Sequence, residues 1–169
     1  MNTTQKFYLK LAEPCRENWF LPPQDPLGEL SHFDMELRRF CFEHNQKVLL
    51  EIGDEKQELF LDPDIILILD EIPEKIDDLY RGKKNELDFP ESRMIIYLEP
   101  RKEYWRIGCT WRKYGYSIEE KSFELETKQL FQTLKTFVKK ILTQAVDKGY
   151  IQDREKTEFM KRMVKPSVG

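Results

Sequence analysis

The sequence predicts an α+β fold: an antiparallel (mixed) sheet of about five to seven strands, with a long C-terminal helix and one or two further helices packed on it. Three observations support this. Between residues 7 and 125, apolar and polar residues alternate in short segments, as in antiparallel strands with one buried face. A long apolar stripe at helical spacing follows. The elements run in the order strands, helix, strands, two helices, which favours segregated layers.

The composition indicates one globular domain. With 169 residues, of which 40% are hydrophobic and 12% aromatic, the chain can bury one sizeable core. We therefore expect a single domain over residues 1–164 and a short tail over residues 165–169. The longest uncharged apolar run, Ile65 to Leu69, has five residues, against about 20 for a membrane-spanning helix, so no membrane contact is expected.

The N-terminus and the cysteines predict a cytoplasmic protein. The first ten residues contain no apolar stretch of the length found in a secretory signal. Three widely spaced cysteines, Cys15, Cys41 and Cys109, suggest neither a disulfide framework nor a metal knuckle. We expect their thiols to behave as small apolar groups in a reducing compartment.

The first elements are a strand, an irregular segment and a helix. Residues 7–11 alternate in the manner of a half-buried strand, and four prolines then mark residues 14–26 as irregular. We expect two aromatic residues to anchor this segment to the core, Trp19 and Phe20. Apolar positions at helical spacing predict a helix over residues 31–44, although residues 40–42 also fit a strand.

A hairpin and a broken helix follow. Residues 47–60 alternate on both sides of Gly53-Asp54, which supplies turn chemistry. Asp62 is expected to cap a helix whose first residue is Pro63. Pro73 should kink or break this helix, and Gly82 is expected to end it.

The rest of the chain predicts four strands and two helices. The strands are expected at residues 86–89, 93–99, 103–112 and 117–125. The clearest element is a helix over residues 127–148, with lysines opposite its apolar stripe and Gly149 just beyond its end. Such lysines are usual on a solvated helix face, but they also suit an anionic partner. Asp153 is expected to cap a last helix that reaches about Val164.

The most informative segment for function is RKEYWRIGCTWRKYGY, residues 101–116. If residues 103–112 form a strand, its apolar side chains point to the core: Trp105, Ile107, Cys109 and Trp111. The opposite face and the following turn then carry a basic and aromatic surface, for which we predict the contact residues Tyr104, Arg106, Arg112, Lys113, Tyr114 and Tyr116.

This surface has three interpretations. Trp, Tyr and Arg dominate the energetic centres of protein interfaces, which favours another protein as the partner. Aromatic side chains beside cations are also used to bind RNA or single-stranded DNA, although no RNP-type consensus is present. The third interpretation is a solvated sheet face, in which the cations pair across strands with acidic neighbours such as Glu99 or Glu120.

Charge is unevenly distributed along the chain. Residues 1–100 carry 12 Lys/Arg and 22 Asp/Glu, a net charge of −10, whereas residues 101–169 carry 16 and 9, a net charge of +7. One basic and one acidic face are therefore expected. An acidic surface near residues 62–78 is the alternative docking face, and no oligomeric state follows from the sequence.

Catalytic patterns are scarce. Asp64, Glu126 and Lys128 have the letters of a metal-dependent nuclease motif, but the spacing and the order of elements do not fit it. Cys41 and His44 are close enough for a nucleophile pair on a helix, yet no activating third group is evident. The seven glycines are scattered singly, which leaves no phosphate-binding loop. We therefore expect no enzyme, cofactor or metal.

Taken together, these observations predict a non-enzymatic protein that binds another macromolecule, as an inhibitor, an immunity-type protein or an adaptor. In the order of its elements alone, the chain resembles bacterial toxin-immunity domains, and fold does not imply function. Binding of RNA or single-stranded DNA through residues 101–116 is the alternative, and a metal-dependent nuclease is the third hypothesis.

Overall fold

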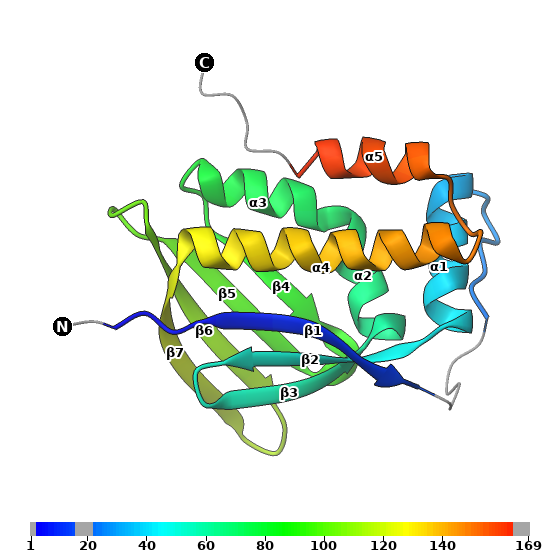
Figure 1. The fold of residues 1–169 in the computed structure, drawn as a ribbon. Coiled ribbons are helices and arrows are strands. Elements are labelled where there is room, and N and C mark those ends of the chain that lie inside the picture. Colours follow the sequence, from blue (N-terminus) through cyan, green and yellow to red (C-terminus); the bar gives the residue numbers. More distant parts are fainter. Residues whose placement is uncertain (1–2, 16–21, 164–169) are drawn as a thin grey trace.

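The computed structural model describes residues 3–15 and 22–163 (Figure 1). The predicted α+β class is confirmed, with the strands divided over two antiparallel sheets. The first has the order β1-β2-β3, with bounds Phe7–Pro14, Gln46–Ile52 and Glu55–Phe60. The second has the order β4-β5-β6-β7, with bounds Asn85–Phe89, Met94–Pro100, Arg106–Tyr114 and Ile118–Glu126.

A short parallel bridge joins the two sheets. The Gln5 N–H donates to the Glu124 carbonyl at 2.7 Å, so the start of β1 continues the second sheet beside β7. At the same end of the first sheet, the turn at Gly53 closely approaches the ring of Phe123, which lies on β7. Side chains from both sheets therefore share one continuous apolar core.

Helices complete this core (Figure 1). They are α1 (His32–Glu43), the short α2 (Ile66–Ile68), α3 (Ile72–Tyr80), α4 (Thr127–Asp147) and α5 (Asp153–Lys161). The long helix α4 runs alongside β1 and packs on it, as Figure 1 shows. Among the described helices, none combines the length and the apolar character needed to cross a membrane.

Helix α4 confirms its predicted stripe, because all eight predicted apolar side chains are buried. Its end is fixed by Gly149 at φ +81°, where the Tyr150 N–H donates to Ala145 O at 2.9 Å and the Gly149 N–H donates to Val146 O at 3.0 Å. This is the Schellman arrangement, in which a left-handed residue lets the last carbonyls find donors.

The predicted helix over residues 31–44 is confirmed as α1, whose N-cap Ser31 accepts the Asp34 N–H at 3.1 Å. The last helix differs by one residue from its prediction. Gln152, not Asp153, occupies the cap, because its side chain and that of Glu155 each bond the other's backbone N–H. This reciprocal pair satisfies two amides that helical bonds leave free.

The segment around Pro63 also corrects a prediction. Asp62 has an extended backbone, and no backbone N–H of the described residues donates to its carboxylate. Asn45 instead bonds the Asp62 N–H and carbonyl, at 3.0 and 2.9 Å. Asp64 is the carboxylate that organises this turn. Further on, Pro73 opens α3 and so breaks the predicted helix, and Gly82 at φ +78° follows its end, as predicted.

Two predictions fall outside the described residues: the anchoring role of Trp19 and Phe20, and the tail over residues 165–169.

Candidate functional site

The segment over residues 101–116 forms a turn, a strand and a hairpin tip rather than one strand from residue 103. The Arg101 N–H donates to Arg106 O at 3.1 Å and the Arg106 N–H donates to Glu103 O at 2.9 Å, which closes a turn before β6 begins. Tyr104 and Trp105 lie in this turn. The prediction that Trp105 points into the core is therefore wrong, since it is 55% exposed. Three other predicted core residues are buried: Ile107, Cys109 and Trp111.

The two predicted contact arginines are engaged by carboxylates of the same molecule. Arg106 lies 3.3 Å from Glu103 and 3.6 Å from Glu124. Arg112 donates to Glu120 on the adjacent strand at 2.7 Å. The hydrogen bonds of Arg112 to Tyr114 and Glu120 raise the pKa of its guanidinium. These ion pairs are those expected of a solvated sheet face whose cations pair across strands. They leave few donors of the two guanidinium groups free for an anionic ligand.

A third arginine, Arg101, lies against the sheet at Gly108, because this glycine has no side chain. Gly108 pairs with Glu124 across the strands, and the Arg101 guanidinium occupies the space that a Cβ at Gly108 would fill. From there Arg101 donates to Glu124 at 2.8 Å. Glu124 thus receives two arginines, Arg101 and Arg106, from the two ends of one turn.

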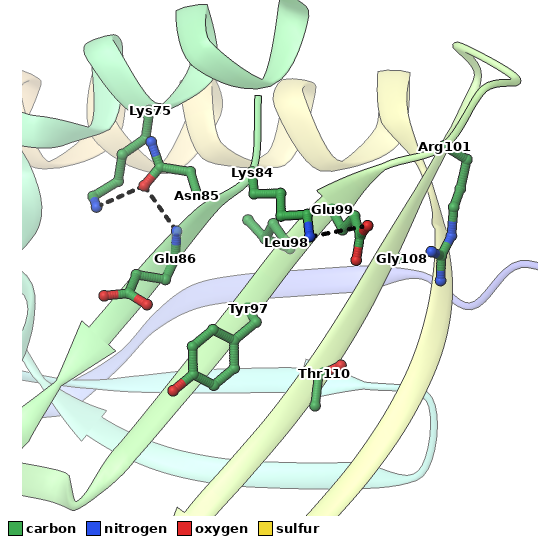
Figure 2. Close-up of a pocket in the computed structure, with 10 residues that line it drawn as sticks. All are labelled: Lys75, Lys84, Asn85, Glu86, Tyr97, Leu98, Glu99, Arg101, Gly108 and Thr110. Atoms are coloured by element: carbon green, nitrogen blue, oxygen red, sulfur yellow. Dashed lines mark hydrogen bonds and ion pairs between the residues drawn. The ribbon is translucent and has the colours of Figure 1, made fainter. Parts of the chain in front are cut away.

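A polar pocket lies beside this arginine on the outer face of β4, β5 and β6, and Figure 2 shows its lining. Its volume is about 530 Å³. Its cations are engaged: Lys75 lies 3.1 Å from Asn85, Lys84 lies 3.5 Å from Glu99, and Arg101 binds Glu124. The lining holds hydroxyl groups and carboxylates but no histidine or cysteine.

The far end of β6 carries an apolar tip. Tyr114 and Ile118 face each other across β6 and β7, and Tyr116 lies in the turn between them. Tyr116 is fully exposed, Ile118 is 65% exposed and Tyr114 is 37% exposed. We call these three residues the aromatic tip. Hydrogen bonds from Tyr97 and then Arg112 lower the pKa of Tyr114.

Lys113 does not share the face of Arg112 and Tyr114. It pairs with Met94 in the register, on the side of the strand that carries Trp111, and its Nζ lies 5.5 Å from the centre of the Trp111 ring. The predicted contact residues are thus divided: Tyr104 and Arg106 lie at the start of β6, and Arg112, Lys113, Tyr114 and Tyr116 lie at its end. Strand β6 has nine residues and is about 26 Å long from Arg106 to Tyr114, at ~3.3 Å per residue.

The sequence did not indicate a groove at the start of β6. Tyr104 and Trp105 line it together with Tyr80 of α3 and Phe131 of α4, and its volume is about 810 Å³. The Tyr80 and Phe131 rings lie 4.4 Å apart. We call this cavity the turn–helix groove. Its walls come from segments far apart in the chain, and its only sequence signal was the pair Tyr104-Trp105.

Helix α4 and its C-cap carry five lysines that make no ion pair with any residue that the structure describes. Four lie within the helix and the last is the C-cap: Lys128, Lys135, Lys139, Lys140 and Lys148. Two of them, Lys128 and Lys135, line the turn–helix groove. Helix α4 therefore carries positive charge that no ion pair engages, whereas the arginines Arg101, Arg106 and Arg112 near β6 are paired.

The residues of the nuclease-like motif, Asp64, Glu126 and Lys128, do not lie close together. The Asp64 carboxylate accepts the Phe60 N–H and the Ser92 hydroxyl, both at 2.9 Å. Figure 1 places the start of α2, next to Asp64, well away from the β7–α4 junction that holds Glu126 and Lys128. Within residues 3–15 and 22–163, no three potential metal ligands cluster.

The two thiols inside the core are not activated. Cys41 and Cys109 are buried, and burial raises the pKa of both, that of Cys109 to about 12. A reactive cysteine has a lowered pKa and some access to solvent. His44 stacks on Phe40 and contacts Tyr150 edge-on, at 5.7 and 5.5 Å between ring centres.

Comparison of the chain with protein-family models, with curated proteins and with solved structures gave no match in any of the three.

Proposed function

We propose that this protein acts without catalysis by binding another protein, as an inhibitor, an immunity-type protein or an adaptor. Its contacts are the aromatic side chains at the two ends of β6, namely Tyr104 with Trp105 and the aromatic tip. In this proposal the ion pairs of Arg106 and Arg112 stabilise the sheet face, and Lys113 stabilises the aromatic tip.

The distribution of exposed apolar side chains carries the proposal. Seven large hydrophobic side chains are exposed among the described residues, and five of them lie between residues 104 and 118. They form one small cluster at each end of β6, and clustered exposed apolar groups usually mark an interaction site. Trp and Tyr are also the residue types whose truncation costs most at protein interfaces.

Nucleic acid is a weaker candidate on the same geometry. Strong binding of a single strand needs cations that neutralise successive phosphates beside the stacking side chains. Along β6 the arginines already pair with Glu103, Glu120 and Glu124, which would also repel a phosphate backbone. A fluorescent oligonucleotide titrated at two salt concentrations tests this alternative, and tight, salt-sensitive binding would favour it.

Affinity capture from the cells of origin, quantified by mass spectrometry, tests the proposal. We compare the wild type with a tip variant, Tyr116→Ala with Ile118→Ser, and with a turn variant, Tyr104→Ala with Trp105→Ala. The matched control, Leu27→Ala with Leu67→Ala, removes two exposed apolar side chains elsewhere on the surface.

We expect at least one end of β6 to be required. Truncation of an interface hot spot costs about 2 kcal/mol or more, which weakens binding about thirtyfold. The control should capture the same partner as the wild type, and nuclease treatment of the extract should not change the result. A protein partner retained equally by all three variants would contradict the proposal.

A further inference from the structure

The turn–helix groove combines an apolar floor with two lysines, which outnumber the one carboxylate of its lining, Glu126. Tyr80 and Phe131 form the floor, and Trp105 and the highly exposed Tyr104 stand beside it. An apolar side chain that enters such a groove loses contact with water on several sides, which is the main source of affinity in protein recognition.

Two lysines flank this floor. Lys128 and Lys135 are seven residues apart on α4, hence on one face and about 10 Å apart along the axis at ~1.5 Å per residue. Phe131 lies between them in the helix. Neither lysine has a carboxylate partner among the residues that the structure describes, so both ammonium groups are available to a ligand.

We propose that the turn–helix groove binds an acidic segment of a partner protein, which inserts one large apolar side chain against Tyr80, Phe131 and Trp105. Carboxylates on either side of that residue pair with Lys128 and Lys135. An extended chain advances ~3.3 Å per residue, so carboxylates about three positions apart span the two lysines. This inference rests on the proposed function and adds the chemical class of the partner at one end of β6.

The surroundings of the groove disfavour a nucleic-acid strand. The phosphates of a strand that continues past the two lysines would have to pass Glu126, which lines the groove, and Glu103, two residues before Trp105. A short peptide needs only the local charge of two lysines. The floor presents one ring pair, Tyr80 and Phe131, whereas a single strand is bound by successive stacked bases.

A random peptide library displayed on phage tests the inference on the immobilised full-length protein. Enriched peptides are then made with a fluorescein label and titrated by fluorescence anisotropy. We expect them to carry Trp, Phe, Tyr or Leu with Asp or Glu within about three positions on either side. Raising the salt concentration should weaken their binding.

Variants locate the site. Trp105→Ala and Lys135→Glu should each raise the Kd about tenfold or more, and Lys135→Gln should raise it less than Lys135→Glu. Lys148→Glu is the matched control, because it reverses the same charge on α4 outside the groove, and it should change the Kd by less than about twofold. Circular dichroism confirms that each variant is folded.

Several results would overturn the inference: no enriched peptide, peptides without carboxylates, equal losses from Lys135→Glu and Lys148→Glu, or acidic peptides that bind Trp105→Ala normally. Self-association of the chain that blocks the groove, or binding of oligonucleotides alone, would also overturn it. The proposed function fails separately. Peptides or partners that depend on Tyr116 and not on Trp105 would refute the groove and leave protein binding intact.

Discussion

Asp64 shows how one buried carboxylate fixes the link between the two sheets. It is 1% exposed and accepts hydrogen bonds from Phe60, at the end of β3, and from Ser92, between β4 and β5. Burial raises the pKa of this carboxyl, although the two hydrogen bonds act in the opposite direction. The site therefore needs an acceptor at this position more than it needs a negative charge.

This predicts a specific pH dependence of stability. Because the folded pKa of Asp64 is raised above its ordinary value of about 4, the folded state binds the proton more tightly than the unfolded state. Its favourable contribution is present below the ordinary pKa and is lost as the pH rises through the raised pKa. In urea unfolding between pH 4 and 7, the stability of the wild type relative to Asp64→Asn should fall as the pH rises. A relative stability that increases over this range would contradict the assignment.

Gly108 gives a second prediction at the scale of a residue. A Cβ at Gly108 meets only the end of the flexible Arg101 side chain, so Gly108→Ala should displace the guanidinium from Glu124 without straining the backbone. A double-mutant cycle with Arg101→Ala should show a coupling of about 0.5–1 kcal/mol, the range of a partly exposed ion pair. In the Arg101→Ala background, Gly108→Ala should be neutral or stabilising. Additive effects would show that Arg101 does not depend on this glycine.

At the scale of elements, the sequence pattern within one segment was sufficient to predict each element whose structure depends on burying its own apolar side chains. The stripe of α4, the hairpin of β2 and β3 and the helix stop at Gly82 follow from local periodicity and turn chemistry. The start of β6 was not predictable in this way, because the turn that exposes Trp105 is closed by backbone bonds of Arg101 and Arg106. The ion pairs of β6 and the turn–helix groove depend on strand register and on contacts between distant segments.

The contact between α4 and β1 predicts the role of a single side chain. The Gln129 amide accepts the Phe7 N–H at 2.9 Å and donates to the Phe7 carbonyl at 2.7 Å, on the edge of β1 opposite β2. Gln129→Ala should lower the free energy of unfolding by about 1–3 kcal/mol, because two backbone groups lose their partner. Gln132→Ala, on the same helix, should change it by less than about 0.5 kcal/mol. Equal effects in denaturant titrations would contradict this role.

At the scale of the whole molecule, basic residues behind the charge asymmetry of the sequence include two groups that differ in their partners. Arginines around β6 neutralise carboxylates of the same sheet, whereas the lysines of α4 lack such partners among the described residues. The predicted basic and aromatic surface is therefore not one continuous face. Its aromatic part lies at the two ends of β6, and the adjacent helix α4 adds lysines that no ion pair engages.

Site-specific photo-crosslinking in the cells of origin tests the central claim most directly. Tyr104 or Tyr116 is replaced by p-benzoylphenylalanine, and the exposed Leu27 and Leu67 serve as control positions. We predict a discrete protein adduct from at least one end of β6 and none from the control positions. Adducts that form equally at all four positions, or only with nucleic acid, would contradict the claim that the ends of β6 bind a protein partner.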